Sequence, residues 1–186
     1  MAIWSTDRWR ELSSLSAGFI FATIWFDMMF DVKLIDCCLS ECSLEEISSK
    51  QTVISAYYSQ VTWYAPPPMR ILLGFVMVMG IISSYYSWKR HPFLWFLQPL
   101  LLAIVSVMAA ISTFPACYWL GHNPPEPEKF LGSSCRVFTE HGFQLGLVFL
   151  HILLHLFCVK QSNLAKKEKL DSQILKKKKL LKIKKK

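Results

Sequence analysis

The sequence predicts an all-α fold, a four-helix transmembrane bundle with two outer loops and a basic C-terminal tail. Of its 186 residues, 53% are hydrophobic, more than the about 45–50% of an ordinary soluble domain. These residues gather in four runs, each long enough to cross about 30 Å of hydrocarbon. We expect one multi-pass membrane domain over residues 1–159, a tail over 160–186, and spans at about 12–30, 69–87, 93–114 and 141–159.

The first span, about 12–30, is expected to be a retained helix. The segment before it carries Arg8 and Arg10 but also Asp7 and Glu11. The apolar run is too long for the core of a secretory signal and is followed by no clean small-residue cleavage site. We therefore expect that no signal peptidase removes the first helix.

Two outer loops are expected between the spans, over about 31–69 and 115–140. Within the first loop, Ile47–Tyr58 has the pattern of a short interfacial helix. Its Tyr57 and Tyr58 suit a belt at the lipid headgroups.

The third span, about 93–114, follows the tight turn WKRHP. Pro92 fits its first helical turn, where a missing N–H costs little, and Pro99 predicts a kink near its start.

Small residues recur at short helical spacing in every expected span. Such faces let helix backbones approach closely in lipid, either within one chain or against a partner. The sets are Ser14, Gly18 and Ala22; Gly80 and Ser84; Ala103, Ser106, Ala110 and Thr113; and Gly142 and Gly146.

Charge predicts the topology. From Lys160 onward the tail holds 12 Lys against two acidic residues, whereas the rest of the chain has 9 Lys and Arg against 11 acidic residues. With four spans both termini share a side, which then holds 16 basic residues against 5 opposite. The positive-inside rule puts that side in the cytosol. We expect the endoplasmic reticulum or a connected membrane, with the mitochondrial inner membrane as the alternative.

Five of the six cysteines fall on the opposite, oxidising side in this topology. We expect Cys117 to pair with Cys135, and Cys42 to pair with Cys37 or Cys38, with a bridge between the two loops as an open alternative. Zinc is the competing interpretation, but the spacing C-C-x3-C is not that of a zinc ribbon. We therefore predict disulfides, no metal and no cofactor.

The polybasic tail predicts contact with anionic lipid headgroups, since each Lys near such a surface contributes about 1 kcal/mol. It lacks the interleaved aromatic residues that would stack on bases, so we expect no nucleic acid. Lys182 and Lys184 also fit the K-x-K-x-x pattern of dilysine retrieval signals for the endoplasmic reticulum.

Four polar residues interrupt the apolar fourth span and share one helical sector: Gln144, His151, His155 and Cys158. Polar groups are costly at that depth, which makes them candidates for a ligand pocket. The pair His151 and His155, four residues apart, also has the spacing to bind one metal ion or relay a proton. The alternative is that the histidines form hydrogen bonds to neighbouring helices.

Asp27 and Asp31 give a second candidate site near the outer end of the first span. They share a helical face, and we expect them either to pair with Arg70, Lys33 or His141, or to line a pocket for a cationic amine, a cation or acid–base chemistry. Glu140 and His141 lie at the same expected level. A relay that runs from Asp27 through His151 to His155 is geometrically possible if the first and fourth helices touch.

The strings WFDMMFDV (25–32) and YYSQVTWYAPPPMR (57–70) resemble a family of small, uncharacterised four-span membrane proteins. That family has an aspartate-rich first helix (W-x-D-x-M-F-D), a Y-Y-x-x-V-T segment and a Pro-Met pair opening the second span. The resemblance implies the four-span fold and no known activity. In its intramembrane acidic residues alone, the chain is similar to the sterol-isomerase/sigma-2-receptor superfamily, whose bundles place acids around an amine or sterol pocket.

Three functions follow as hypotheses. The first is a non-enzymatic accessory or scaffold subunit that packs against a larger membrane protein. The second is a protein or enzyme that binds a lipid-like or sterol-like small molecule through Asp27, Asp31, Gln144, His151 and His155. The third is an ion or proton path through those residues. No complete catalytic set stands out, so the sequence favours a protein that is not an enzyme.

Overall fold

The structure is a computed structural model that describes residues 5–64, 67–88, 91 and 93–183. Every regular element over these residues is a helix, and none of them forms a strand, which confirms the predicted all-α class. The chain divides into two compact units, Met1–Ile152 and Leu153–Lys186. In chain order the elements are α1 (Thr6–Asp31), η1 (Val32–Leu34), α2 (Ile35–Leu39), α3 (Leu44–Tyr58), η2 (Ser59–Tyr64), α4 (Pro67–Trp88), α5 (Leu94–Met108), η3 (Ala109–Thr113), α6 (Phe114–His122) and α7 (Pro127–Ile183).

Within the described residues, four helical stretches are long and apolar enough to cross a membrane. Each overlaps one of the four expected spans. Arg70–Trp88 differs from the expected span by one residue at each end, whereas the other three extend well beyond the expected span at one or both ends, because the helices continue past the apolar runs. The stretches are Thr6–Leu39, Arg70–Trp88, Leu94–His122 and Pro127–Ile174.

The core of the first unit lies among α1, α4, α5 and the part of α7 before residue 153. Its buried residues include Ala17, Ile20, Leu102, Val105 and Val148. α1 and α4 approach closely at Gly80, where an added Cβ would lie 3.3 Å from the Ser16 Cβ. The expected small pair in α4 is therefore buried at this contact.

The small face expected on α1 is not the one that packs. Ser14, Gly18 and Ala22 are exposed, and the opposite face with Ser16 and Ala17 is buried instead. Ser13, Ser16 and Ala17 form a second run of small residues, flanked by Ile20 and Ile24 on the same face, and this run is the one that packs inside the chain. The face with Ser14, Gly18 and Ala22 is left to lipid or to a partner.

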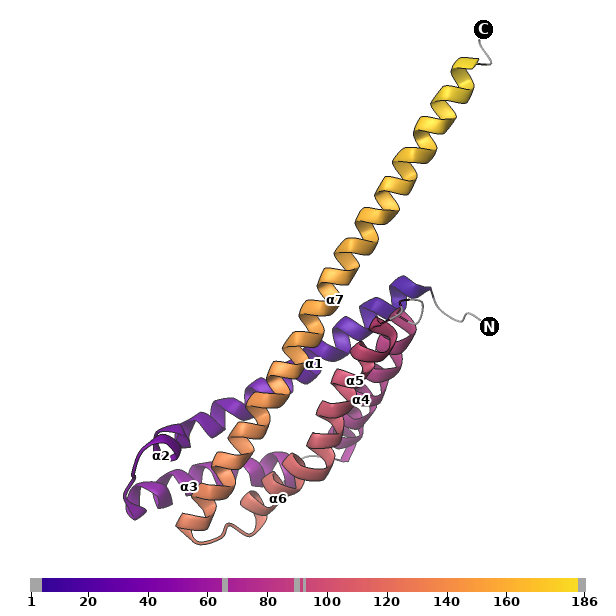
Figure 1. The fold of residues 1–186 in the computed structure, drawn as a ribbon. Coiled ribbons are helices and arrows are strands. Elements are labelled where there is room, and N and C mark those ends of the chain that lie inside the picture. The colour runs from indigo at the N-terminus through magenta and orange to yellow at the C-terminus, as the bar shows by residue number, and fades with distance from the viewer. Residues whose placement is uncertain (1–4, 65–66, 89–90, 92, 184–186) are drawn as a thin grey trace. The chain divides into compact units, whose positions relative to one another are not determined.

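The two expected loops are largely helical. The helix expected at Ile47–Tyr58 is present as α3, which begins three residues earlier at Leu44, whereas α2, α6 and the first turns of α7 correct the prediction of loops. α2 and α3 occupy much of the first loop, and α6 with the first turns of α7 occupies the second. These segments bury an apolar face of their own, which stabilises short helices that their local sequence would not. We call residues 32–58, which include η1, α2 and α3, together with α6 and residues 127–137 of α7 the cap. It lies at one end of the first unit (Figure 1), and its core contains Leu34, Ile47, Ile54, Tyr58, Cys117, Leu120, Phe130 and Val137.

α6 packs directly on the backbone where α3 continues into the π-helical turn η2. A Cβ on Gly121 would lie 2.4 Å from the Ser59 nitrogen and 2.6 Å from the Tyr58 carbonyl carbon. No side chain fits at that separation, so this contact requires glycine. The start of α3 is fixed by Ser43, whose Oγ accepts a hydrogen bond of 3.2 Å from the Glu46 backbone nitrogen.

Two disulfides hold the cap. Cys37 is bonded to Cys42 within the connection from α2 to α3, which is one of the open alternatives. Cys38 is bonded to Cys135 with a Cα–Cα distance of 5.8 Å, so the bridge between the two expected loops is the one that forms.

The expected Cys117–Cys135 bridge is wrong, because Cys117 has a free thiol. Residues 114–122 form a helix rather than a loop. That helix turns the Cys117 side chain into the apolar core of the cap, whereas Cys135 faces α2.

The second unit is the C-terminal part of α7, which continues as a helix through most of the Lys-rich tail. His155 belongs to this unit. Lys182 lies in α7 but its side chain is outside the described residues, as is the whole of Lys184.

Candidate functional site

A buried carboxylate, an imidazole and a phenol meet where α1, α3 and α7 converge. Asp31 ends α1, and its Oδ2 lies 2.6 Å from His141 Nδ1. Its Oδ1 accepts a hydrogen bond from the Tyr58 hydroxyl. Asp31, Tyr58 and His141 are each at most 3% exposed. Both oxygens of Asp31 are thus engaged, and the carboxylate is part of the packed interior.

Asp27 lies one turn earlier on the same face of α1. Its Oδ1 accepts a hydrogen bond of 2.5 Å from the Tyr57 hydroxyl. Its Oδ2 faces His141 Nε2 at 3.9 Å, which is too long for a hydrogen bond. The Asp27 side chain is 24% exposed, against 1% for Asp31. Asp27 is therefore the more accessible of the two carboxylates, and its hydrogen bond from Tyr57 engages Oδ1.

We call Asp27, Asp31, Tyr57, Tyr58 and His141 the Asp–His–Tyr cluster. The cluster places two carboxyl groups around one imidazole, so it holds more groups that can become negative than groups that can become positive. With Nδ1 donating to Asp31, the Nε2 atom is an acceptor in the neutral ring and a donor in the protonated ring.

Tyr57 and Tyr58 serve the cluster as hydrogen-bond donors. Burial, reinforced by negatively charged neighbours, raises the pKa of each tyrosine well above its ordinary value. Both hydroxyls stay protonated at physiological pH and can donate to Asp27 and Asp31. Tyr57 is also fixed by stacking on Phe30, with ring centroids 3.6 Å apart.

A second polar group adjoins the cluster through Glu140, the residue before His141. Glu140 accepts hydrogen bonds from Ser112 at 2.7 Å, from Thr113 at 3.0 Å and from Arg136 at 2.9 Å. Gln144 donates to the Thr113 hydroxyl at 2.6 Å. Gln144, expected to line a pocket with the histidines, thus joins α7 to η3 near the outer acids.

His151 lies elsewhere on α7. Its Nδ1 is 3.1 Å from the Gln98 carbonyl oxygen in α5. Ten residues separate it from His141, about 15 Å along the helix. The amide oxygen and nitrogen of the Gln98 side chain are buried without a hydrogen-bond partner among the described residues. The polar residues expected to share one pocket are therefore separated. Gln144 joins the outer polar group, His151 contacts α5, and His155 belongs to the second unit.

Of the three expected partners for the aspartates, the structure selects His141. Arg70 instead donates to the Trp63 carbonyl oxygen at 2.6 Å, and the Lys33 ammonium lies 5.4 Å from the Phe30 ring centroid.

Sequence reasoning missed the role of Tyr57 and Tyr58, which were expected to be headgroup anchors. The sequence did contain a signal, because two adjacent tyrosines end the helix expected in the first loop. They can reach the aspartates of α1 only if this loop folds back onto α1, and the sequence of the loop does not show that fold.

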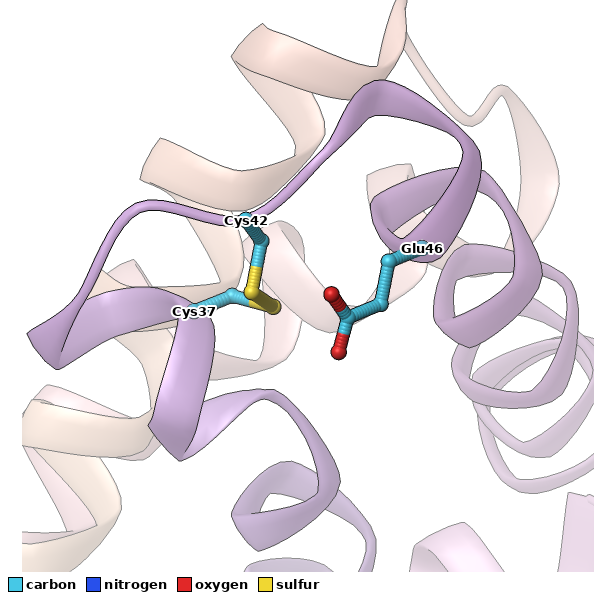
Figure 2. Close-up of side chains that lie close together, drawn as sticks. All are labelled: Cys37, Cys42 and Glu46. Carbon is cyan, nitrogen blue, oxygen red and sulfur yellow. A yellow bond between two sulfur atoms is a disulfide. The ribbon is translucent and has the colours of Figure 1, made fainter.

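A group of potential metal ligands lies in the cap, shown in Figure 2. The ligand atoms of Cys37, Cys42 and Glu46 are all within 4.8 Å of one another. The two sulfurs are bonded to each other, and the Lys50 ammonium lies 3.2 Å from Glu46 Oε1 and 3.4 Å from Cys37 Sγ. A disulfide is a poor ligand and Lys50 already supplies the positive charge, so the arrangement does not favour a cation.

Comparison with protein-family models, with curated proteins and with solved structures finds no match to this chain. The resemblances described from the sequence stay predictions.

Proposed function

We propose that the protein spans a membrane four times and binds an amphipathic small molecule through a basic amine at Asp27. One observation carries this proposal. Asp27 Oδ2 lies 3.9 Å from His141 Nε2, too far for a hydrogen bond, and the Asp27 side chain is 24% exposed. An ammonium group beside Asp27 would pair with its carboxylate and offset the negative charge there.

The membrane assignment rests on the four apolar helices and on how little of their surface is buried inside the protein. Only 22–28% of the residues in their apolar windows are buried inside the protein. Large apolar side chains such as Phe26, Ile71, Ile111 and Phe143 lie on the outside, each more than half exposed. Such surfaces require lipid or a partner.

We further propose that both termini lie in the cytosol and that the membrane is the endoplasmic reticulum or one connected to it. The basic tail and the disulfide-rich cap at opposite ends of the expected topology support this orientation. Introduced glycosylation acceptors test it: a site in the cap connection at Ser40–Ser43 should be glycosylated, and one at the C-terminus should not. Glycosylation of the C-terminus would overturn the orientation.

Binding is a better proposal than catalysis for this site. Asp31 and His141 hold each other in a buried pair, and Asp31 has no free oxygen with which to accept a substrate proton. The geometry therefore supports recognition of a cation by Asp27.

The amine proposal is tested with two probes of equal chain length, dimethyldodecylamine and dodecanol. The amine should raise the Tm of the purified protein in neutral detergent, and the alcohol should not. Asp27→Asn should abolish the shift, while Asp36→Asn, which changes an exposed aspartate on α2, should retain it. Equal shifts with both probes, or a shift that survives Asp27→Asn, would overturn the proposal.

A second candidate function is that of an accessory subunit in a larger membrane complex. It is favoured by Gly142 and Gly146 on α7 and by Gly18 on α1, where an added Cβ would meet no atom within 4 Å. These small-residue faces are unused inside the chain, and such faces suit close packing against another helix in lipid.

Purification in mild detergent from native membranes tests this second function. A stoichiometric partner should copurify with the wild-type protein and be lost with Gly146→Leu, but not with Gly132→Leu, which changes another open glycine in the cap. Purification of the wild type without a partner would exclude the accessory function under these conditions.

A further inference from the structure

We propose that the Cys37–Cys42 disulfide is a thiol-exchange site that accepts electrons from small thiols of the glutathione type, while the Cys38–Cys135 disulfide is a structural crosslink. This inference does not depend on the proposed ligand site, which lies in other residues.

The two sulfurs of the Cys37–Cys42 bond differ in access. Cys42 lies half-buried in the irregular connection Ser40–Ser43, between the end of α2 and the start of α3. Cys37 is 4% exposed and packs in the core of the cap. An incoming thiolate therefore reaches Cys42 Sγ, and Cys37 becomes the leaving group.

A cation is positioned at the leaving sulfur. The Lys50 ammonium lies 3.4 Å from Cys37 Sγ. It is held there by Glu46, whose carboxylate is 3.2 Å away on the preceding turn of α3; Figure 2 shows this carboxylate facing the disulfide. A neighbouring lysine stabilises a thiolate, and a more stable thiolate leaves faster in exchange.

The reaction consists of two exchanges. A thiolate attacks Cys42 Sγ, the Cys37–Cys42 bond breaks, a mixed disulfide forms on Cys42, and Cys37 leaves as a thiolate beside Lys50. A second small thiolate then attacks the sulfur that the first one contributed. The small-molecule disulfide departs, Cys42 becomes a thiolate, and both protein thiolates take protons from solvent. Two small thiols are oxidised and one protein disulfide is reduced.

The second disulfide has a different place in the fold. Cys38 and Cys135 both lie within helices, α2 and α7, and their bond spans 97 residues of sequence against 5 for Cys37–Cys42. A bond that closes a long loop restricts the unfolded chain more and so stabilises the fold more. Reducing the Cys38–Cys135 bond therefore costs more of the free energy of folding than reducing Cys37–Cys42, so it requires a more strongly reducing thiol mixture.

The first test is an equilibrium titration of the full-length protein in detergent with mixtures of reduced and oxidised glutathione. Differential alkylation followed by mass spectrometry reports the state of each cysteine. Cys37 and Cys42 should become reduced in mixtures in which Cys38 and Cys135 are still bonded. Simultaneous reduction of both bonds, or earlier reduction of Cys38–Cys135, would overturn the assignment.

The second test is kinetic. Lys50→Gln should slow reduction of Cys37–Cys42 by glutathione by about threefold or more, since the leaving thiolate loses its cation. Lys50→Arg should restore most of the rate. Lys129→Gln is the matched control, because it removes a different lysine of the cap, whose ammonium lies 3.7 Å from the Glu126 carboxylate. An unchanged rate in Lys50→Gln, or an equal loss in Lys129→Gln, would contradict the role of Lys50.

The third test locates the attacked sulfur. Acid quenching before the reaction is complete should trap glutathione on Cys42. Glutathione found on Cys37 would reverse the proposed direction of attack and so overturn it.

Discussion

His141 Nδ1 lies 2.6 Å from Asp31 Oδ2, although the two residues are 110 positions apart in the chain. The contact joins the end of α1 to α7 inside the protein, and the Tyr58 hydroxyl engages the other oxygen of the same carboxylate. Removing a charge from water is costly, so the carboxylate is tolerated there because both of its oxygens have partners.

Replacing one member of this pair should be strongly destabilising. We expect Asp31→Ala and His141→Ala each to lower the free energy of unfolding by about 3 kcal/mol, because each removes one partner and leaves a buried polar group unsatisfied. Thermal unfolding in detergent, followed by tryptophan fluorescence, measures the loss. Asp36→Ala is the matched control at an exposed aspartate and should change stability by less than about 0.5 kcal/mol. Equal Tm values for Asp31→Ala and Asp36→Ala would contradict the pairing.

The tyrosine donors predict a loss of stability at alkaline pH. Because burial raises the pKa of Tyr57 and of Tyr58 in the folded protein, their hydrogen bonds contribute fully below the ordinary tyrosine pKa of about 10. The unfolded chain releases these protons first, so the contribution declines as pH rises above that value. The Tm of the wild type should therefore fall more steeply above about pH 10 than that of the variant Tyr57→Phe/Tyr58→Phe. Parallel curves would exclude this contribution.

The contact between α6 and η2 should not tolerate a methyl group. Gly121→Ala would bring Cβ to 2.4 Å from the Ser59 nitrogen, and we expect a loss of about 2–3 kcal/mol through forced separation of the helices. Gly132→Ala is the matched change in α7, where nothing lies within 4 Å. It should be neutral or stabilising by about 0.5–1 kcal/mol. A stable Gly121→Ala protein would show that α6 does not pack on the backbone at Ser59.

The two disulfides should contribute unequally to stability. In the chain-entropy account, Cys38→Ser/Cys135→Ser removes a bridge across 97 residues and should cost about 4–5 kcal/mol. Cys37→Ser/Cys42→Ser removes a bridge across 5 residues and should cost about 2 kcal/mol. Chemical unfolding of both double variants under oxidising conditions compares them. A larger loss for the Cys37–Cys42 variant would contradict this ranking.

The free thiol of Cys117 gives a direct check on the connectivity. Maleimide should label it only after unfolding, because the residue is 5% exposed in the cap core. Peptide mapping without reduction should then find Cys38 linked to Cys135. A Cys117–Cys135 peptide would restore the connectivity that the sequence alone favoured.

The helical class and the four long apolar helices could be predicted from the sequence because hydrophobic runs of that length carry their own signal. Most of the cap could not, although the pattern of Ile47–Tyr58 predicts the helix that forms α3. The packing that stabilises α3 and α6 comes from one apolar core, which contains Ile54, Leu120 and Phe130. Contacts between segments so far apart leave no local pattern.

The candidate site was predictable in part. The sequence predicts Asp27 and Asp31 as site residues because a carboxylate in an apolar helix is costly, and it offers His141 as one of three partners. Choosing among Arg70, Lys33 and His141 requires knowing which helices touch. The same information places Gln144 and His151, which share a face of α7 and contact one helical stretch, Leu94–His122, at Thr113 and at Gln98.

The Cys38–Cys135 bond closes residues 38–135 into a covalent ring that contains α3, α4, α5 and α6. A protease that nicks the backbone once anywhere inside this ring leaves both fragments attached. The nicked protein would migrate as one species on a gel without reductant and as two with it, and its first and last membrane helices would stay joined.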